Sequence, residues 1–370
     1  MLLAHKIELR PTVEQAVYLD KACGSHRHCY NQLLEHFSKK DNKWSKQAAY
    51  QFYIKVIRPQ FDWYTEVSSR VTRNAIDDLD NAFKHFFRRV KAKQKAGFPQ
   101  FKRKGVKDSF ALREKAKFDV NGRFLRIEKL KTEIKMRQKL RFDGQTKQVT
   151  ISKRAGKYFA SILVETQEYN PKDIERKSSI GVDFGIKALA TLSNGVVFDA
   201  NQKLRTNLKK LRKLQKNLSR KTKSSNRRVR AKLKLAKFHF RVSNQRQAVL
   251  HKLSDYLTAN FERIVIEDLH VKGMIKNHSL ALSISDAGFG NLRQQIEYKA
   301  KLRNCKLVIA DRFFPSSKTC SNCGSINKDL TLSDRIYSCN CGLELDRDLN
   351  AAINLNNYGV DRLQPTKKRT

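Results

Sequence analysis

Three acidic residues stand where a strand ends or a helix begins, and active-site carboxylates commonly project from such positions. Asp183 follows the strand-forming Ile180 and Val182, Glu267 closes the apolar run RIVIE, and Asp348 lies in DRDLNAAINL. Three converging carboxylates can hold two Mg²⁺ ions about 3.5–4 Å apart, one activating water and the other stabilising the leaving oxygen. The chemistry that this set predicts is phosphodiester hydrolysis.

Each acid also has an ordinary structural explanation. Asp183 could be a turn residue, because the D-x-G pattern around it is weak, and Glu267 could form a buried salt bridge. In the final segment, Asp346 can cap a helix whose first turn contains Asp348. Capping explains one aspartate but not three acids at these positions of one fold. We therefore predict that Asp183, Glu267 and Asp348 are catalytic.

Four cysteines form a second candidate site. Cys320 and Cys323 are separated by two residues, fifteen residues follow, and Cys339 and Cys341 are separated by one. Two close thiolate pairs across a short ribbon match a tetrahedral Zn²⁺ site. Four thiolates leave no open coordination position, so the predicted zinc is structural. A glycine directly follows each pair, as a knuckle turn requires, although the second pair is one residue shorter than usual.

The elements around the acids predict a ribonuclease-H-like fold. Residues 178–198 should form a three-stranded meander, and residues 263–269 and 306–311 two further strands, with a helix at about 286–303 between them. The cysteines then lie in an insertion, residues 316–344, between the last strand and the last helix. We expect this insertion to place a basic, zinc-pinned finger at the mouth of the acid site.

A long basic segment separates the first two acids. No acid occurs from Asn201 through Ser254, and the polar link KTKSSNRR divides two apolar stripes, so we predict an antiparallel helical hairpin over 203–260. The stripes consist of Leu204, Leu208, Leu211, Leu214 and Leu218, and of Val229, Leu233, Ala236 and Phe240. A surface of one sign should lie against phosphates. A coiled-coil dimer is the alternative, which repulsion between the basic faces disfavours.

The N-terminal half begins with a predicted strand at residues 2–9 and a helical region at 11–90 with breaks near Gly24, Asp41–Asn42 and Pro59. The helical context argues against a second metal site at the residues that could ligate one there: Cys23, His26, His28, Cys29 and His36.

Short strands are predicted from about 108 to 168, with hairpin turns at Asn121–Gly122 and Ala155–Gly156. Together with the N-terminal strand they suggest a small β-barrel. The predicted division is therefore a barrel from 1–10 and 91–177 and a nuclease domain over 178–370.

Composition narrows the class of protein. The 370 residues hold 77 Lys and Arg against 35 Asp and Glu, a net charge of +42 that favours a bound polyanion. Ribosomal-type binding is the simplest alternative on charge alone. No apolar run reaches the ~18 residues that span a bilayer, and the start MLLAHKIELR is too charged for a signal peptide. We expect a cytoplasmic protein, associated with the nucleoid when bound to DNA, without a membrane partner and without disulfides.

At the level of motifs, the chain resembles the TnpB family, transposon-encoded RNA-guided nucleases related to type V CRISPR effectors. The motifs that carry the resemblance are GVDFGIK, IEDL, LALSISDAGFG, FFPSSKTCSNCG, DRDLNAAINL and, in the N-terminal half, FPQFKRK. The resemblance implies an α+β multidomain protein: a helical recognition domain, 11–90, inserted in a wedge-like β-barrel and followed by a RuvC nuclease domain that a zinc module interrupts.

The resemblance further implies a guide RNA from the transposon end, double-stranded target DNA beside a short adjacent motif, and no required protein partner. The family's three catalytic carboxylates fall on Asp183, Glu267 and Asp348, and its zinc ligands on the four cysteines. The shortened pair Cys339–Asn–Cys341 departs from the family pattern. A strand-transfer transposase and a repressor that binds nucleic acid without cleaving it are the two alternatives.

The helix at about 67–90 carries Arg70, Arg73 and Asn74 close together, and the family reads its adjacent motif with the corresponding helix. Arg pairs with guanine and Asn with adenine in the major groove. These residues are therefore predicted to read base edges, the alternative being that they contact phosphates only.

Overall fold

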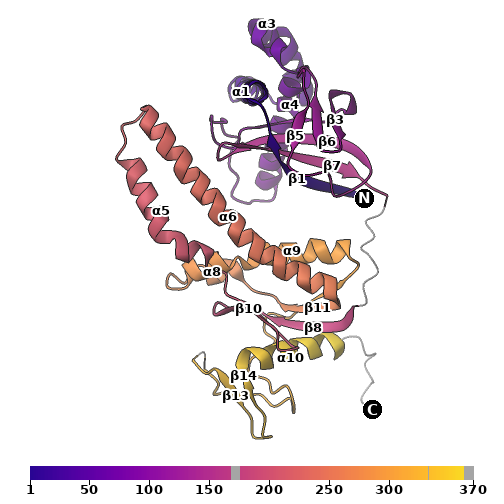
Figure 1. Cartoon of the computed structure of the whole chain (residues 1–370), viewed down its shortest axis with the longest axis vertical. Coiled ribbons are helices and arrows are strands. Elements are labelled where there is room, and N and C mark those ends of the chain that lie inside the picture. Colours follow the sequence, from indigo (N-terminus) through magenta and orange to yellow (C-terminus); the bar gives the residue numbers. More distant parts are fainter. Residues whose placement is uncertain (168–175, 332, 362–370) are drawn as a thin grey trace. The chain divides into compact units, whose positions relative to one another are not determined.

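The computed structural model describes residues 1–167, 176–331 and 333–361, and the chain divides into two compact units, residues 1–169 and 170–370 (Figure 1). The predicted ends of the barrel near 177 and of the nuclease domain at 370 fall in or next to residues outside these described ranges. None of the described helices is both long and apolar enough to cross a membrane.

The first unit is built on a seven-stranded sheet in the order β2-β6-β7-β1-β5-β4-β3. Strand β1 lies in its middle and pairs antiparallel with β7 and β5, which confirms the predicted N-terminal strand. Both predicted hairpin turns are also present: positive φ angles at Gly122 and at Ala155 and Gly156 close β3–β4 and β6–β7. The strands are β1 (Leu2–Arg10), β2 (Ser109–Leu112), β3 (Phe118–Asn121), β4 (Phe124–Ile127), β5 (Ile134–Met136), β6 (Gln145–Arg154) and β7 (Lys157–Glu165).

Helices fill the sequence between β1 and β2: α1 (Val13–Phe37), α2 (Lys46–Phe52), a π-helical turn (Tyr53–Ile57), α3 (Arg58–Gln60), a 3₁₀ turn (Asp62–Glu66) and α4 (Ser69–Lys91). Thr12 begins α1 through a capping box with Gln15. The predicted break near Asp41–Asn42 is confirmed. The break at Gly24 is wrong, because α1 keeps its buried face on both sides of that glycine.

The cysteines and histidines of α1 belong to different surroundings. Cys23 is buried in the cluster between the sheet and the helices, whereas Cys29 is buried in a second cluster among the helices themselves. His26 Nδ1 and Nε2 lie 3.0 Å from the Val71 carbonyl and from Asp78, and His36 stacks on an aromatic ring. These side chains are used in packing and hydrogen bonding.

The second unit contains a five-stranded sheet in the order β10-β9-β8-β11-β12. The predicted meander is confirmed as antiparallel β8, β9 and β10, and β8, β11 and β12 run parallel. The strands are β8 (Lys177–Asp183), β9 (Ala188–Leu192), β10 (Val197–Asp199), β11 (Phe261–Glu267) and β12 (Lys306–Ala310). The meander and the two parallel strands that follow it stand in the order along the chain that the sequence predicts.

Helices cover both faces of this sheet. Ile264 and Ile266 of β11 pack on one face with α6 (Asn226–Asn260) and α9 (Phe289–Leu302), whereas Val265 faces α10 (Arg347–Asp361) on the other. Burial of alternate residues on opposite faces explains why the run from Ile264 to Ile266 in this parallel strand is apolar. The shorter helices α7 (Val271–Met274) and α8 (Ala281–Ala287) precede α9.

The basic hairpin consists of α5 (Lys203–Ser219) and α6, which lie side by side in Figure 1. Its first predicted stripe contributes Leu204, Leu211, Leu214 and Leu218 to the seam. The second predicted stripe is wrong: Leu235, Phe238 and Val242 fill the seam, and Val229 and Leu233 are exposed. Two apolar stripes share α6, and sequence periodicity alone could not show which one faces α5.

Glycine lets α10 lie directly on β8. A Cβ atom at Gly181 would stand 2.0 Å from the carbonyl oxygen of Ala352, and one at Gly359 would stand 2.3 Å from Val265. A backbone atom cannot move aside as a side chain can. The approach of α10 to the sheet therefore depends on Gly181.

We expect Gly181→Ala to lower the free energy of unfolding by at least about 1–3 kcal/mol, the usual effect of overpacking. Thermal denaturation followed by circular dichroism measures it. Gly290→Ala is the matched control, since a Cβ there meets no atom within 4 Å. Equal midpoints for the two variants would contradict the close contact between α10 and β8.

Candidate nuclease site

The three predicted catalytic acids lie at one end of the five-stranded sheet. Asp183 ends β8, Glu267 ends the parallel neighbour β11, and Asp348 lies in the first turn of α10, which packs on β8. Val182 pairs with Ile266, so the next residue of each strand is an acid. The fold thus places the three acids at the same end of the sheet, although they are far apart in the sequence.

Electrostatics reflect this proximity. Burial, and then the charges of Glu267 and Asp348, raise the pKa of Asp183 well above its usual value, which Arg347 opposes. Like charges in a poorly solvated site disfavour ionisation. A site of this kind gains stability when a cation binds between the carboxylates, and three carboxylates are a suitable donor set for Mg²⁺.

Neighbouring residues fix two of the acids. The Oδ1 atom of Asp346 accepts from the backbone N–H groups of Asp348 and Leu349 at 2.9 and 3.0 Å, so the predicted cap is confirmed. Ser316 Oγ donates to Glu267 Oε1 at 2.6 Å. The cap orients the first turn of α10, and the serine orients the Glu267 carboxyl group.

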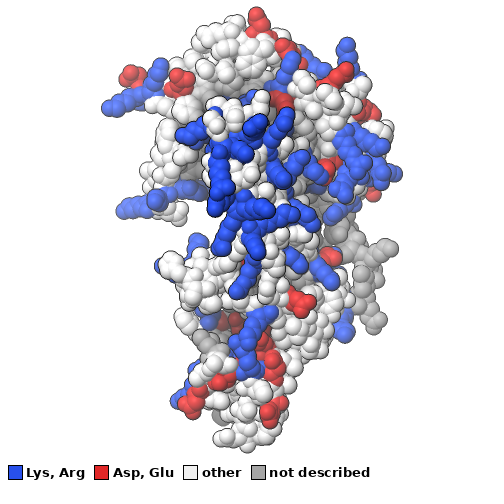
Figure 2. Space-filling model, turned by 60° about the vertical axis from the view of Figure 1, so that its left-hand side comes forward, with Lys and Arg blue, Asp and Glu red and all other residues white. Residues whose placement is uncertain are grey.

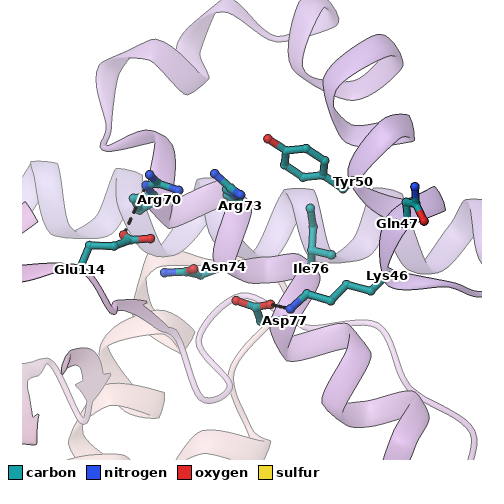
Figure 3. Close-up of a pocket in the computed structure, with 9 residues that line it drawn as sticks. All are labelled: Lys46, Gln47, Tyr50, Arg70, Arg73, Asn74, Ile76, Asp77 and Glu114. Carbon is teal, nitrogen blue, oxygen red and sulfur yellow. Dashed lines mark ion pairs between the residues drawn. The ribbon is translucent and has the colours of Figure 1, made fainter. Parts of the chain in front are cut away.

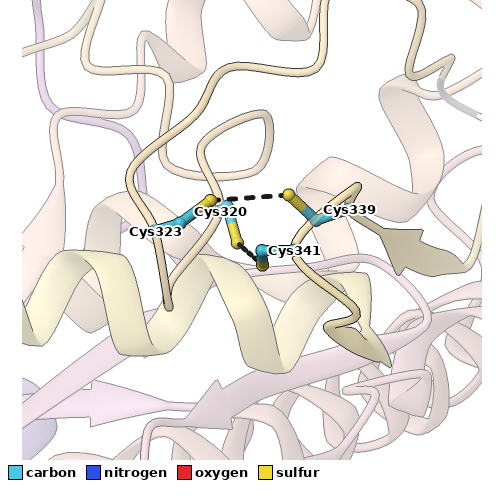
Figure 4. Close-up of side chains that lie close together, drawn as sticks. All are labelled: Cys320, Cys323, Cys339 and Cys341. Atoms are coloured by element: carbon cyan, nitrogen blue, oxygen red, sulfur yellow. Dashed lines mark hydrogen bonds between the residues drawn. The ribbon is translucent and has the colours of Figure 1, made fainter.

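The four cysteines converge on one point (Figure 4). Among the described residues they are the one group of His, Cys, Asp or Glu with three or more ligand atoms within 4.8 Å of one another. Cys320 Sγ lies 3.6 Å from Cys341 Sγ, and Cys323 Sγ lies 3.5 Å from Cys339 Sγ. A tetrahedron with Zn–S bonds near 2.3 Å has edges of about 3.8 Å. The shortened second pair therefore still closes a site of the right size.

Glycines shape both knuckles as predicted. Gly324 and Gly342 have φ angles of 77° and 87°, and their N–H groups donate to the carbonyls of Cys320 and Cys339. Two short strands, β13 (Ile336–Ser338) and β14 (Glu344–Asp346), pair antiparallel beside the second knuckle. The fully buried Tyr337 forms the small core of the ribbon.

Two asparagines of α10, which the sequence interpretation missed, bind the first knuckle. Asn350 Nδ2 donates to the Thr319 carbonyl at 2.8 Å, while its Oδ1 accepts from Ser321 N. One turn later, Asn354 Nδ2 donates to the carbonyls of Ser316 and Thr319. The signal was present as two asparagines four residues apart on the buried face of DRDLNAAINL. One helix thus holds both a candidate catalytic acid and the cysteine ribbon.

The expectation of a basic finger is wrong. Residues 316–344 contain three basic and three acidic side chains: Lys318, Lys328, Arg335, Asp329, Asp334 and Glu344. Figure 2 shows the same contrast: red and blue side chains mix at the lower end, where Figure 1 places β13 and β14, whereas blue predominates elsewhere on that face. The net positive charge of the chain therefore resides outside the ribbon.

The basic hairpin is attached through Asp286, another residue whose role the sequence did not reveal. Its buried carboxylate accepts from the backbone N–H groups of Leu204 and Arg205 at 3.0 and 2.8 Å and so caps α5. It also lies 3.2 Å from Arg246 Nε of α6. One acid of the motif LALSISDAGFG therefore holds both helices of the hairpin.

The three predicted motif-reading residues lie on α4 in the first unit, around a cavity of about 470 Å³ (Figure 3). Arg73 stacks over the Tyr50 ring at 4.7 Å, and Arg70 Nε lies 3.3 Å from Glu114. Asn74 is the exception: its side chain is buried and donates to the Ala111 carbonyl at 2.9 Å. The structure therefore contradicts base reading by Asn74, because its amide is already used to hold α4 on the sheet.

The raised pKa of Asp183 predicts how the stability of the fold depends on pH. A carboxyl group whose folded pKa is raised stabilises the fold below its unfolded pKa, near 3.8, and this contribution is lost as pH rises through the folded pKa. In metal-free buffer, Asp183→Asn should therefore raise the thermal midpoint at pH 7, and the difference should vanish below about pH 4. Added Mg²⁺ should raise the midpoint of the wild type more than that of the variant. A midpoint at pH 7 equal to or below that of the wild type would contradict the electrostatic strain.

Family models and relatives match large parts of this chain. Residues 161–278 match the family model described as "Probable transposase", residues 289–355 the "Cas12f1-like, TNB domain" and residues 1–40 a "Helix-turn-helix domain". A "Putative RNA-guided DNA endonuclease" of Streptomyces pristinaespiralis is 33% identical over 363 residues, covering 95% of this chain and 88% of the relative.

A second relative, "Putative RNA-guided DNA endonuclease InsQ" of Escherichia coli K12, is 30% identical over 375 residues, 96% of this chain and 91% of its own. The structure titled "Cryo-EM structure of the Cas12f1-sgRNA-target DNA complex" is similar with a TM-score of 0.59 at 14% identity, over 92% of this chain and 83% of the other. At that identity the likeness shows the fold alone, which is a mixed α/β fold.

Proposed function

This chain belongs to the TnpB family, and on that premise we propose that it is an RNA-guided DNA endonuclease. The observation that carries the proposal is the convergence of Asp183, Glu267 and Asp348 at one end of a ribonuclease-H-like sheet. In this proposal a guide RNA from the transposon end pairs with the target, and one RuvC-like site cuts both DNA strands.

The order of the elements along the chain supports the proposed domain boundaries. A wedge-like barrel, from 1–10 and 91–177, is interrupted by a helical recognition domain over 11–90, because β1 precedes the helices and the other strands of its sheet follow them. The nuclease domain over 178–370 carries the hairpin at 203–260 and the ribbon at 316–344 as insertions between elements of its sheet and α10.

Two Mg²⁺ ions held by Asp183, Glu267 and Asp348 would supply an activated water and would stabilise the leaving oxygen. The residues around them keep this set in place: Ser316 orients Glu267, and the Asp346 cap fixes the turn that carries Asp348. Gly181 lets α10 approach β8 and so brings Asp348 beside Asp183. One Zn²⁺ held by the four cysteines would have a structural role, because four thiolates would occupy all four positions of a tetrahedral ion.

The hairpin is the candidate surface for the guide RNA. Residues 201–254 hold nineteen Lys and Arg and no acid, and most of them are exposed on α5 and α6. A surface of this kind binds phosphates without sequence preference, and the salt dependence of that binding is steep. Because Asp286 caps α5 and pairs with α6, it couples the hairpin to the helices of the nuclease domain.

Two other classes of protein would share some of these features. A strand-transfer transposase would also use three acids and Mg²⁺ but would join DNA ends without a guide, and a repressor would need the charge only. The nuclease proposal requires one defined RNA, sensitive to ribonuclease, to copurify with the chain. Sequencing that RNA would identify the guide and separate the three classes.

With that RNA bound, we expect the chain to cut a matching duplex in Mg²⁺, and Asp183→Ala, Glu267→Ala or Asp348→Ala to lower the single-turnover rate by at least about 100-fold. RNA binding should survive in each variant, because the acids lie outside the basic hairpin. Asp329→Ala, which removes an exposed acid of the ribbon, is the control and should cut normally. Near wild-type cutting by any of the three variants would remove that residue from the catalytic set.

The cavity on α4 supports reading of the adjacent motif by Arg70 and Arg73. Two carboxylates, Asp77 and Glu114, line it together with Lys46, and a pocket built only for phosphate would be weakened by those negative charges. Arginine beside carboxylates instead offers both donors and acceptors, the combination that base edges require. Tyr50 supports this assignment, since the Arg73 guanidinium lies over its ring, 4.7 Å from the centroid, in a cation–π contact.

We expect Arg73→Ala or Arg70→Ala to change the preferred motif in a cleavage screen with randomised flanking DNA, by about 1–3 kcal/mol per lost base contact. Arg89→Ala, an exposed change near the end of the same helix, should leave the preference unchanged. Uniformly weaker cutting with an unchanged motif would assign Arg70 and Arg73 to phosphate binding.

A further inference from the structure

A solvent-exposed aromatic residue stands beside the candidate catalytic site. Phe313, in the turn between β12 and the cysteine ribbon, is 87% exposed, more than any other large hydrophobic residue in the described parts of the chain. Its neighbour Phe314 is turned inward and packs against Tyr358 of α10, with ring centroids 4.7 Å apart. Of two adjacent phenylalanines, one therefore packs against the core and the other projects into solvent.

The turn that carries Phe313 is held on both sides. Asp311 Oδ1 accepts from the Phe313 N–H at 2.9 Å, and the Asp311 N–H donates to the Tyr358 hydroxyl at 3.1 Å. Three residues after Phe313, the Ser316 hydroxyl donates to Glu267 at 2.6 Å. A rigid connection of a few residues thus joins the exposed ring to a candidate catalytic carboxylate.

Charge is scarce where a nucleic-acid strand would have to lie. The ribbon beside the three candidate catalytic acids is balanced, with three basic and three acidic residues. The nearest arginine in sequence, Arg312, is paired with Asp268 at 2.6 Å, and Arg293 shares that carboxylate. The proposed Mg²⁺ ions would attract the phosphate that is cut. The balanced ribbon and the paired Arg312 offer little attraction to the rest of the strand, for which Phe313 supplies an uncharged contact.

We propose that Phe313 is a stacking residue for an unpaired base of the DNA strand that is being cut, next to the phosphodiester at the three carboxylates. The inference rests on the proposed nuclease function. Bases stack on aromatic side chains in single-strand sites whatever their sequence, because every base has a π-face. Phe313 is thus a positioning residue: it holds the strand while the carboxylates serve the reaction.

Because Phe313 is exposed, its side chain can be changed with little effect on folding. Phe313→Ala removes the ring, Phe313→Leu keeps an apolar side chain without a π-face, and Phe313→Tyr keeps the ring. Because the ring packs on so little of the chain, all three variants should unfold at the wild-type temperature. Ile336→Ala, a similarly exposed apolar change at 55% exposure on the ribbon, is the matched control.

The first readout is independent of cleavage. The full-length protein with its RNA is titrated with a short single-stranded DNA containing 2-aminopurine, in Ca²⁺ to prevent cutting, and stacking is followed as quenching of its fluorescence. The expected result is quenching by the wild type, Phe313→Tyr and Ile336→Ala, with about tenfold weaker binding or loss of quenching in Phe313→Ala and Phe313→Leu. Equal quenching by all five proteins overturns the proposal, whether or not the protein cuts DNA.

The second readout is the single-turnover rate of guided cleavage in Mg²⁺ as a function of salt. A stacking contact should survive added salt, so the deficit of Phe313→Ala relative to wild type should remain about tenfold across the salt series. If Phe313→Leu cuts as fast as Phe313→Tyr, apolar contact alone suffices and the stacking role fails. A wild type that is inactive with its bound RNA, yet quenches through Phe313, would contradict the nuclease proposal and leave the stacking role standing.

Discussion

Helix α10 lies on strand β8 at a distance that only glycine permits, and the organisation of the second unit depends on that contact. The same helix presents Asp348 in its first turn and holds the first knuckle of the ribbon through Asn350 and Asn354. Ser316, at the start of the ribbon, donates to Glu267 on the sheet. Acids and ribbon are therefore parts of one packed assembly, in which a shift of α10 would displace both.

The candidate catalytic acids and the largest group of basic side chains lie on different elements of the second unit. The candidate catalytic end combines carboxylates with a ribbon of balanced charge, whereas nineteen Lys and Arg are concentrated at residues 201–254. Phosphates at the hairpin would lower the self-repulsion of a chain with a charge of +42. Cations at the acids would lower the repulsion between the negative charges there. In the proposed function, a polyanion balances the basic hairpin and metal ions balance the acids.

Sequence reasoning succeeded where a local pattern has one structural outcome. Alternation in residues 2–9, glycine turns such as Asn121–Gly122 and the apolar run before Glu267 predicted their elements correctly. It failed where the outcome depends on a partner element. The α6 stripe was misassigned because two apolar rows compete for one seam, and Asn74 looked like a base reader until its bond to Ala111 was seen. Asp286 gives no local signal, since the helix that it caps begins 83 residues earlier.

The family resemblance assigned roles to residues whose function composition and spacing had left open. The structure adds the burial and the contacts of those residues, which a sequence motif does not contain. In FFPSSKTCSNCG the first phenylalanine is exposed and the second is partly buried against Tyr358, while the first serine binds Glu267. From the sequence alone, Phe313 and Phe314 cannot be distinguished. Burial explains the second by its packing on α10, but packing cannot explain the first, because an exposed ring contributes little to stability. A large exposed apolar side chain on a hydrogen-bonded turn beside the candidate catalytic site is best explained by what binds there.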